Sequence, residues 1–398
     1  MYRKVKDDIY SVGIIDWHRE LFDELIPLPN GTSYNSYFIK GQEKNVIIDT
    51  VEPDFVEEFL NNLKDLGVEK LDYIISNHAE QDHSGSLPHL LKEFPDAQIL
   101  SGEKAKTMLL DLLELESDQI RVVEDGETID LGGKTLEFIA TPWVHWPETI
   151  STYLQEEKIL FSCDFFGSHL ATSDLYVKDE HKVYEAAKRY YAEIMMPFRM
   201  IIKKNLIKLK DYEIEMIAPS HGLIYDNPEM ILNAYQDWVS DRVKPEVIIP
   251  YVSMHGSTAD LINYLISSLI NKGIKVKPFN LTDVDLGTLA ISLVDASTVV
   301  FGSPTVLTGP HPAAAYAAYL ANVLKPKTRY ASIIGSYGWA GRMTDKLLDL
   351  MPNLKLELYD PVIAKGHGNR EDYQGIDRLV GEIKSYFSNV NSCRILIS

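Results

Sequence analysis

Cysteine is almost absent from this chain, which has only Cys163 and Cys393 among its 398 residues. Two cysteines that lie far apart in sequence exclude a framework of disulfide bonds, and they exclude a cysteine-rich zinc or iron–sulfur module. Any metal that the protein binds must therefore be held by histidine, aspartate and glutamate side chains.

Basic residues are also scarce, because 39 lysines and arginines face 58 aspartates and glutamates, which gives a formal net charge of -19 at pH 7. Nucleic acids and anionic membranes attract basic surfaces, so we expect neither as a partner. No stretch reaches about 18 apolar residues, the length of a membrane-spanning helix, and the N-terminus has charge without an apolar signal segment. We therefore expect a soluble, cytoplasmic protein.

The pattern of strands and helices changes along the chain, whose length suits two domains. Residues 1–245 alternate short strand-like runs, several in adjacent pairs, with helical stretches, a pattern of sheets with helices outside. Residues 246–398 follow a regular β-α-β order, which predicts a doubly wound parallel sheet. The polar segment 238–245, which ends in a proline, is the expected boundary. The expected strands are 9–15, 37–39, 45–49, 71–76, 135–140, 158–162 and 216–219, then 247–252, 275–280, 298–302, 330–335 and 355–358; the expected helices include 53–66, 103–113, 183–205 and 372–387.

The strongest chemical signal is the segment 77–83, Asn-His-Ala-Glu-Gln-Asp-His, directly after an apolar strand-like run. It places His78, Glu80, Asp82 and His83 on a loop where the end of a strand points side chains into a cleft. Imidazole suits several transition metals, and the added carboxylates favour a harder, redox-active ion such as iron or manganese. The segment therefore predicts a metal site.

Three further potential ligands stand where other apolar runs stop. They are His145 in a loop between two prolines, Asp164 after the run 158–162, and His221 after the run 216–219. A single histidine or aspartate at such a place is more often a cap or a hydrogen-bonded polar group. Seven potential ligands in this order argue for binding, and they suit two metal ions better than one.

The second domain has three loops with nucleotide-binding chemistry at the ends of expected strands. The first, 253–258, supplies hydroxyls and backbone N–H groups just before a helix, whose N-terminus favours a phosphate. The second, 302–309, and the third, 335–341, are placed to flank a flavin ring, one with backbone hydrogen bonds and the other with an aromatic face. No Gly-x-x-x-x-Gly-Lys-Ser/Thr motif is present, which disfavours a P-loop NTPase. The residues expected to bind the cofactor are Ser253, Met254, His255, Gly256, Ser257, Thr258, Ser303, Pro304, Thr305, Leu307, Thr308, Gly309, Ser336, Tyr337, Gly338, Trp339 and Gly341.

The ligand order His-x-Glu-x-Asp-His, then His, Asp and His, resembles the metallo-β-lactamase fold, whose zinc hydrolases carry a histidine where this chain has Glu80. Together with the three loops, it resembles the flavodiiron proteins (A-type flavoproteins) over essentially the whole chain. The resemblance implies a metallo-β-lactamase-like αββα sandwich in residues 1–245, with two iron ions, and a flavodoxin-like domain in residues 246–398, with FMN. It implies that one iron is held by His78, Glu80 and His145, the other by Asp82, His83 and His221, and both by Asp164.

The same resemblance implies an activity and its partners. Flavodiiron proteins reduce dioxygen to water or nitric oxide to nitrous oxide, so one or both gases are the expected substrates. Electrons are expected from rubredoxin or a reduced deazaflavin, because the chain has no Cys-x-x-Cys pair for a fused rubredoxin module. A head-to-tail homodimer, or a dimer of such dimers, is expected because the partner's flavin would complete the electron route.

Some positions depart from the resemblance or stay open. Asp23 stands where relatives often carry a histidine, and His255 stands where many carry an aromatic residue. Tyr190 or Tyr191 is a candidate catalytic residue near the metal pocket, although either fits equally well as a packed helix aromatic. Two other functions remain, namely a zinc hydrolase of the metallo-β-lactamase fold with a flavodoxin-like tail, and an electron carrier whose metal domain only docks. Glu80 argues against the first, and the complete ligand set argues against the second.

Overall fold

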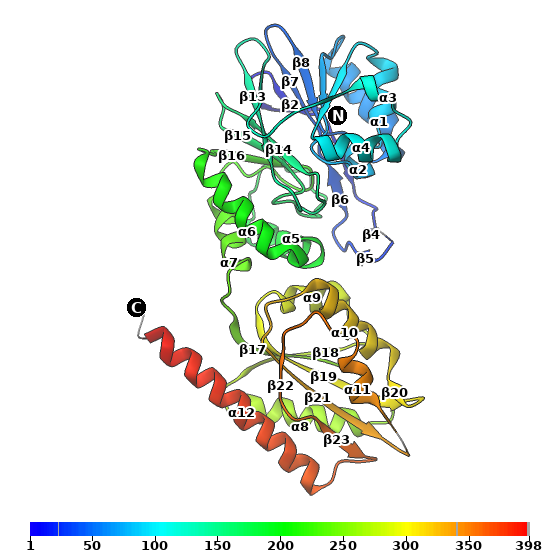
Figure 1. Ribbon diagram of the computed structural model, residues 1–398, viewed down its shortest axis with the longest axis vertical. Coiled ribbons are helices and arrows are strands. Elements are labelled where there is room, and N and C mark those ends of the chain that lie inside the picture. The colour runs from blue at the N-terminus through cyan, green and yellow to red at the C-terminus, as the bar shows by residue number, and fades with distance from the viewer. Residues whose placement is uncertain (23, 340, 396–398) are drawn as a thin grey trace. The chain divides into compact units, whose positions relative to one another are not determined.

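The computed structural model describes residues 1–22, 24–339 and 341–395, with side chains as far as Ser388. The chain forms two compact units (Figure 1), one of Met1–Tyr191 with Phe198–Val239 and one of Ala192–Pro197 with Ser240–Ser398. The division between Val239 and Ser240 lies within the segment 238–245, the expected boundary, and the first strand of the second unit begins at Lys244.

Two β-sheets form the centre of the first unit, with strand orders β1-β2-β7-β8-β9-β10-β11 and β12-β13-β14-β15-β16. A buried cluster joins Ile48 and Ile75 of the first sheet to Phe138 and Phe161 of the second, so the two sheets pack face to face. The strands of the first sheet are Arg3–Lys6, Ile9–Ser11, Tyr37–Lys40, Asn45–Ile48, Tyr73–Ile75, Gln98–Ser101 and Ile120–Val122, and those of the second are Thr128–Asp130, Thr135–Ala140, Ile150–Leu154, Ile159–Cys163 and Met216–Pro219. Two short ribbons pair β3 (Ile14–Asp16) with β6 (Thr32–Tyr34) and β4 (Leu21–Phe22) with β5 (Ile26–Pro27).

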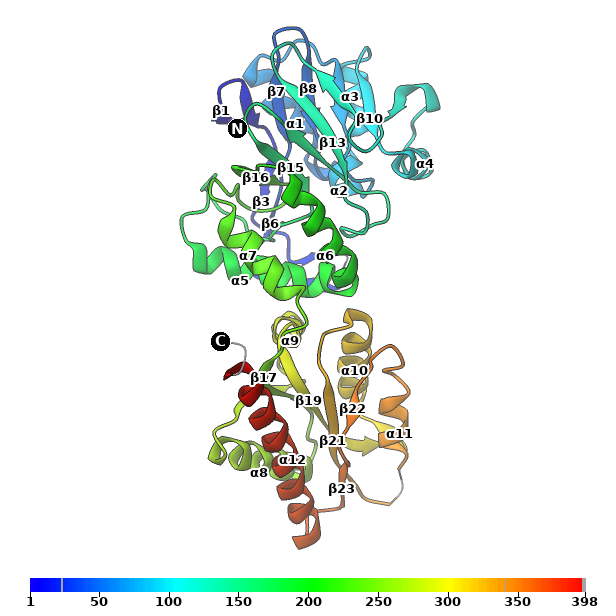
Figure 2. The same cartoon turned by 60° about the vertical axis from the view of Figure 1, so that its left-hand side comes forward.

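Helices cover the outer faces of both sheets, which makes the first unit an αββα sandwich (Figures 1 and 2). Successive strand residues point to opposite faces, and so Ile47 and Ile74 pack with Phe59 under the outer helices while their neighbours Ile48 and Ile75 face the other sheet. Burial on both faces explains why these strands read as continuous apolar runs. The helices are α1 (Val56–Leu66), α2 (Gln81–Ser84), α3 (Leu87–Glu93), α4 (Glu103–Leu112), α5 (Glu180–Tyr190), α6 (Arg199–Lys208) and α7 (Glu229–Trp238).

Two expected elements of the first unit are less regular than predicted. Residues 183–205 are helical as expected, but α5 ends at Tyr190, and a π-helical turn (Tyr191–Met195) and a 3-10 turn (Met196–Phe198) lead into α6, which begins at Arg199. Pro197 lies in the 3-10 turn, and proline cannot donate the backbone hydrogen bond of an α-helix interior. The strand expected over 9–15 is split at Gly13, where a Cβ atom would lie 2.2 Å from the Tyr34 carbonyl oxygen.

The second unit is a parallel sheet with helices on both faces (Figures 1 and 2). Its strand order is β18-β17-β19-β21-β22, with β23 also paired to β21 and the short β20 paired to β19. Counted along the chain, this is the 2-1-3-4-5 order of flavodoxin-like folds, and the expected fold class is confirmed for both units. The strands are β17 (Lys244–Tyr251), β18 (Lys275–Asn280), β19 (Ala296–Val306), β20 (Gly309–Pro310), β21 (Tyr330–Tyr337), β22 (Glu357–Leu358) and β23 (Val362–Lys365). Helices α8 (Ser257–Asn271) and α12 (Arg370–Ile395) lie on one face, and α9 (Leu286–Leu293), α10 (Pro312–Leu324) and α11 (Met343–Leu348) lie on the other.

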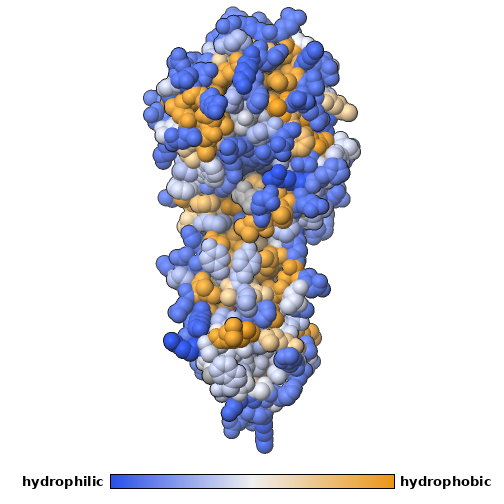
Figure 3. Space-filling model, turned by 90° about the vertical axis from the view of Figure 1, so that its right-hand side faces the viewer, coloured by the Kyte–Doolittle hydropathy of each residue, from blue (hydrophilic) through white to orange (hydrophobic). Residues whose placement is uncertain are grey.

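The surface mixes residues of both kinds. On the face seen in Figure 3, hydrophilic and hydrophobic residues are interspersed over both units. The most exposed large apolar side chains in the described part of the second unit are Leu307 and Trp339, which lie in the second and third of the expected flavin loops. Among the helices of the described residues, none has the length and apolar character needed to cross a membrane.

Candidate metal centre and flavin pocket

The first four potential ligands follow strand β9. His78 lies in the segment after the strand, and Glu80 occupies the N-terminal cap position of α2. Asp82 and His83 belong to α2 itself, so the expectation that all four lie on a loop is wrong for these two. The helical turn lets Glu80, Asp82 and His83 face one buried site, whereas an extended chain would point neighbouring side chains to opposite faces.

The other three ligands lie at the ends of strands in the second sheet. His145 follows β13, Asp164 follows β15 and His221 follows β16. Strands β15 and β16 are parallel neighbours, so their carboxyl ends meet at one edge of the sheet. Gly222, with φ of 83°, lets the chain turn directly after His221, and a Cβ atom there would lie 2.1 Å from Ser168 Oγ.

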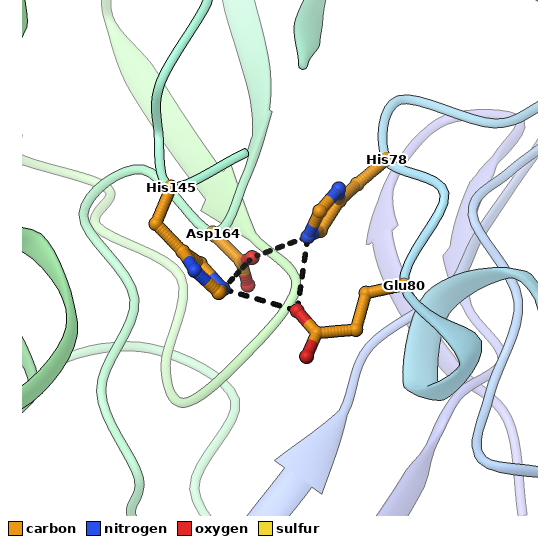
Figure 4. A group of neighbouring side chains, drawn as sticks. All are labelled: His78, Glu80, His145 and Asp164. Carbon is orange, nitrogen blue, oxygen red and sulfur yellow. Dashed lines mark hydrogen bonds and ion pairs between the residues drawn. The ribbon is translucent and has the colours of Figure 1, made fainter. Parts of the chain in front are cut away.

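The first group of ligands consists of His78, Glu80, His145 and Asp164, whose donor atoms lie within 4.8 Å of one another. Glu80 Oε2 is 3.0 Å from the Nε2 atoms of both His78 and His145. Asp164 Oδ2 is 3.4 Å from His78 Nε2 and 3.6 Å from His145 Nε2. Figure 4 shows these side chains converging on a common centre.

The second group consists of Asp82, His83 and His221, again with donor atoms within 4.8 Å of one another. Asp82 Oδ1 is 3.3 Å from His83 Nε2, and its Oδ2 is 3.2 Å from His221 Nε2. The other oxygen of Asp164, Oδ1, lies 3.1 Å from His83 Nε2 and 3.4 Å from His221 Nε2. Each oxygen of Asp164 thus faces one group, and Asp164 is shared between them.

These donor atoms fit a pair of cations. Both carboxylate oxygens of Asp82 and of Asp164 are buried and have no hydrogen-bond partner among the described residues. Buried carboxylates without donors are costly unless a positive charge faces them. With bonds of about 2.1 Å, two ligand atoms on one metal ion lie about 3.0–3.4 Å apart, and the N–O distances within the two groups run from 3.0 to 3.6 Å.

A cavity of about 210 Å³ lies at the carboxyl ends of the central strands in the second unit. It is lined by Ser253, Met254, His255, Ser257, Thr258, Pro304, Thr305, Ser336, Tyr337, Gly338 and Gly366, of which only Gly366 is not among the residues expected from the sequence. The other expected residues, which this lining does not include, are Gly256, Ser303, Leu307, Thr308, Gly309, Trp339 and Gly341. Two of these residues hold neighbouring backbone in place. Gly256, with φ of 93°, caps α8, and Ser303 accepts a hydrogen bond from the His311 backbone N–H at 3.0 Å.

Comparisons with known proteins find relatives that align with most of this chain. Residues 32–222 match the ODP family beta lactamase. The coenzyme F420H2 oxidase of Methanothermobacter marburgensis is 32% identical over 88% of this chain and 89% of its own length. The nitric oxide reductase of Moorella thermoacetica is 34% identical over 89% of this chain and 90% of its own length.

Solved structures agree over nearly the whole chain. The flavodiiron protein of Giardia intestinalis superposes with a TM-score of 0.91 at 29% identity, over 98% of each chain. This chain belongs to the flavodiiron protein family. The rubredoxin oxygen:oxidoreductase of Desulfovibrio gigas also superposes, with a TM-score of 0.94 at 27% identity, over 98% of this chain and 99% of that one.

The converging charges of this candidate metal centre shift the pKa values of its side chains. Burial alone would lower the pKa of the His83 imidazole, but the charges of Asp82 and Asp164 raise it to about 9. Burial opposes ionisation of Asp164, yet His83 and its neighbouring imidazoles hold the pKa of that carboxyl well below its ordinary value. Cys163 lies close to both, but burial raises the pKa of its thiol well above the ordinary value, so the thiol stays protonated. Metal ligation requires neutral imidazoles, and metal binding here would therefore release protons.

Tyr190 is the better placed of the two candidate catalytic tyrosines. Its buried ring lies 5.9 Å from that of His221, and burial together with the Asp164 charge raises the pKa of its hydroxyl well above the ordinary value. Tyr191 is also buried, and its ring packs against Tyr235 at 5.5 Å in the aromatic cluster under α7. A catalytic role for either tyrosine stays a prediction.

Two buried residues support the centre without having been expected from the sequence. Asp49, after β8, accepts hydrogen bonds from the backbone and side chain of Asn77 and from the Ser220 hydroxyl. His169 packs behind the second group, with its ring 4.9 Å from that of His221. Neither residue belongs to a motif with a spacing signal, and only the fold reveals these contacts.

The two departures from the family resemblance have different outcomes. Asp23 lies outside the described residues. His255 lines the flavin cavity beside Met254, and its imidazole takes the place in the first loop where an aromatic ring is common.

Proposed function

We propose that this flavodiiron protein reduces dioxygen to water, nitric oxide to nitrous oxide, or both, at a pair of iron ions held by the two ligand groups. Electrons would reach the irons through FMN bound in the cavity of the second unit. The balanced reactions are O2 + 4e⁻ + 4H⁺ → 2H2O and 2NO + 2e⁻ + 2H⁺ → N2O + H2O.

One observation carries this proposal. Asp164 presents one oxygen to each ligand group, at 3.1–3.4 Å from the imidazoles of one group and 3.4–3.6 Å from those of the other. A carboxylate shared in this way supports two cations at short separation, which suits a diatomic substrate that must contact both. The ligand set contains no sulfur, and its mixture of imidazole and carboxylate suits iron.

The side chains hold the pair in place and control its charge. Glu80, Asp82 and Asp164 supply three carboxylates, which neutralise most of the charge of two divalent ions and stabilise a further increase in that charge. The imidazoles of His78 and His221 are buried, so the fold keeps bulk water away from this part of the site. When bound, a pair of ferrous ions supplies the electrons for reduction and two adjacent positions for the gas.

The flavin cavity supplies the contacts expected for a mononucleotide. Ser253, Ser257 and Thr258 lie around the N-terminus of α8, where backbone N–H groups and the helix dipole favour a phosphate. Tyr337 also lines the cavity and offers an aromatic side chain. When bound, FMN accepts two electrons from a donor and passes them on singly.

The relatives differ in donor and gas, and both remain part of the proposal. One relative is named a nitric oxide reductase, one a coenzyme F420H2 oxidase, and one solved neighbour a rubredoxin oxygen:oxidoreductase. We therefore propose rubredoxin or a reduced deazaflavin as the electron donor. A head-to-tail homodimer, alone or paired into a tetramer, and a cytoplasmic location are part of the same proposal.

The test begins with anaerobic purification, followed by metal analysis and a flavin spectrum. We expect about two irons and one FMN per chain. Consumption of each gas is then measured with an electrode, using reduced rubredoxin, F420H2 or a chemical reductant as donor. Dilution to the monomer should abolish turnover while both cofactors stay bound.

The outcomes separate the competing functions. Two zinc ions per chain, no gas consumption and hydrolytic turnover would establish the zinc hydrolase of the metallo-β-lactamase fold instead. Bound flavin with an empty metal centre and rapid electron exchange would establish the carrier. Full turnover by the diluted monomer would contradict the dimeric electron route but not the chemistry.

A further inference from the structure

Glu148 is a buried carboxylate that contacts a metal ligand from behind. It lies between His145 and strand β14, and its side chain has no exposed surface. Glu148 Oε1 is 2.6 Å from His78 Nδ1 and accepts a second hydrogen bond from the Ala79 backbone N–H at 3.1 Å. The bond to Nδ1 holds the proton on that nitrogen, so Nε2 of His78 is free to face Glu80 and the centre.

The other ligand group has a different arrangement behind its imidazoles. His221 Nδ1 is 2.7 Å from the Ser33 carbonyl oxygen, which is a neutral acceptor. For His83, Nδ1 has no hydrogen-bond partner within the described part of the chain. Each group has one carboxylate of its own, Glu80 or Asp82, and they share Asp164. A carboxylate bonded directly to a ligand imidazole therefore distinguishes the group of His78.

A bonded carboxylate changes the imidazole more than a distant charge does. It draws the Nδ1 proton toward itself, which makes Nε2 a stronger donor to a metal, and loss of such a partner commonly weakens metal binding 10–100-fold. Asp49 is also a buried carboxylate near the centre, but its hydrogen bonds come from Asn77 and Ser220 and not from an imidazole. Asp49 acts on both groups alike, through its hydrogen bonds to the residues that precede His78 and His221 and through its charge, and so it offers a control whose effect is not confined to one group.

We propose that Glu148 is the positioning residue of the group His78, Glu80 and His145, that its hydrogen bond to His78 selectively retains the iron of that group, and that its negative charge tunes that iron. The proposal rests on the proposed iron pair. Glu148 contacts neither the metal nor the substrate position, and it acts entirely through His78.

Two substitutions separate position from charge. In Glu148→Gln the amide oxygen can still accept from His78 Nδ1–H and from the Ala79 N–H, while the charge is lost and the amide nitrogen takes the place of the buried Oε2, which has no hydrogen-bond partner among the described residues. In Glu148→Ala both hydrogen bonds are lost. Glu148→Asp keeps the charge on a side chain one methylene shorter, and it should restore part of what the alanine variant loses.

The readouts are iron retention and the redox equilibrium of each iron. Anaerobically loaded protein is dialysed against a graded iron chelator, and Mössbauer spectra identify which of two iron signals disappears. For Glu148→Ala we expect one iron to be lost at 10–100-fold lower chelator concentration than in the unchanged protein. Titration of the reduced protein with ferricyanide, which takes one electron per molecule and becomes ferrocyanide, gives the two potentials.

For Glu148→Gln we expect both irons to be retained. One iron should become about tenfold harder to oxidise, a rise of about 59 mV for one electron, while the other changes little. For Asp49→Asn we expect the two potentials to move together. A circular dichroism spectrum and the FMN content show that each variant is folded.

Three results would overturn the proposal. In the first, both iron potentials are unchanged in Glu148→Gln. In the second, Glu148→Gln shifts the potentials of both irons equally, as Asp49→Asn is expected to do. In the third, Glu148→Ala holds two irons with unchanged affinity. If the unchanged protein contains zinc, the proposed function fails separately. Glu148 is then tested by zinc retention, where selective loss of one zinc from Glu148→Ala supports the positioning role and full retention overturns it.

Discussion

Asp49 ties together two segments that carry metal ligands, and its replacement by asparagine tests how the centre is held. Asp49 Oδ1 accepts from the Asn77 backbone N–H at 2.8 Å, and Oδ2 accepts from Asn77 Nδ2 at 3.0 Å and from Ser220 Oγ at 3.1 Å. Asn77 directly precedes His78, and Ser220 directly precedes His221. One buried side chain thus connects the first sheet to the second at the site.

The structure gives the expected cost of Asp49→Asn. The new amide group points an N–H donor at Asn77 Nδ2, which is itself a donor. Asn77 cannot simply reverse its amide, because its Oδ1 accepts a hydrogen bond from Thr152 at 2.8 Å. The Ser220 hydroxyl can rotate and accept instead. Hydrogen bonds to a charged group contribute about 1.5–3 kcal/mol each, and so we expect a loss of about 2–4 kcal/mol, against about 1 kcal/mol for Ser220→Ala.

Chemical denaturation of the metal-free protein measures this loss in the unfolding transition of the first unit, and chelator competition measures metal affinity. Asp130→Asn is the control, because Asp130 accepts its hydrogen bond from Gly132 at the protein surface and should cost less than about 0.5 kcal/mol. We expect Asp49→Asn also to weaken metal binding at least about tenfold, since the segments of His78 and His221 lose their common tie. Two results would refute this reasoning. In the first, Asp49→Asn loses no more unfolding free energy than Asp130→Asn; in the second, Ser220→Ala loses as much as Asp49→Asn.

Two shorter predictions concern the ligands of the second sheet. Asp164→Asn removes the charge shared by both groups, and we expect metal analysis to find one metal ion per chain or fewer, with unchanged FMN content; two ions retained at unchanged affinity would show that Asp164 is dispensable. Gly222→Ala introduces a Cβ atom 2.1 Å from Ser168 Oγ at a φ of 83°. We expect thermal denaturation to show a loss of about 2–4 kcal/mol of stability, which combines left-handed backbone strain with the clash. The control Gly126→Ala, at a φ of 79° with open space around it, should show the loss from strain alone.

The fold could be predicted from the sequence largely because its strands are buried on both faces. β16 (Met216–Pro219), which is buried along its whole length, has the bounds that the sequence predicts. The edge strand β18 (Lys275–Asn280) also has the predicted bounds, although Phe279 is its only buried residue. At the edge of the second unit's sheet, the sequence predicts one strand over 355–358, but two short strands, β22 and β23, pair with β21 there. β22 pairs with the beginning of β21 and β23 pairs with its end, and Pro361 stands between them. Proline interrupts a ladder of hydrogen bonds, which a pattern of apolar residues does not show.

The seven potential ligands could be found from the sequence because each stands at the end of a strand or just after one. Parallel strands deliver such residues to a common edge, and the structure brings all seven together. Their role as iron ligands stays a prediction. Asp49 and Glu148 could not be found, because each acts on a segment 28 or 70 residues away through a single hydrogen-bonded contact. Such pairings depend on how the two sheets meet, and no local pattern encodes them.

Glu80 shows why the metal preference of this site can change without a change of fold. It occupies the N-terminal cap position of α2, but its side chain makes no capping hydrogen bond, and its backbone oxygen accepts from His83 N and Ser84 N. The carboxylate is therefore available for the imidazoles of His78 and His145, both 3.0 Å away.

Replacing Glu80 with histidine should leave α2 intact while exchanging an oxygen donor for a nitrogen donor, which favours zinc. When metal-free protein is loaded from an equimolar mixture of ferrous and zinc ions, we expect Glu80→His to raise the bound zinc-to-iron ratio at least about tenfold. The exposed Glu57→His in α1 should leave that ratio unchanged. An unchanged ratio in Glu80→His would mean that the rest of the ligand set, and not this oxygen donor, decides which metal is held.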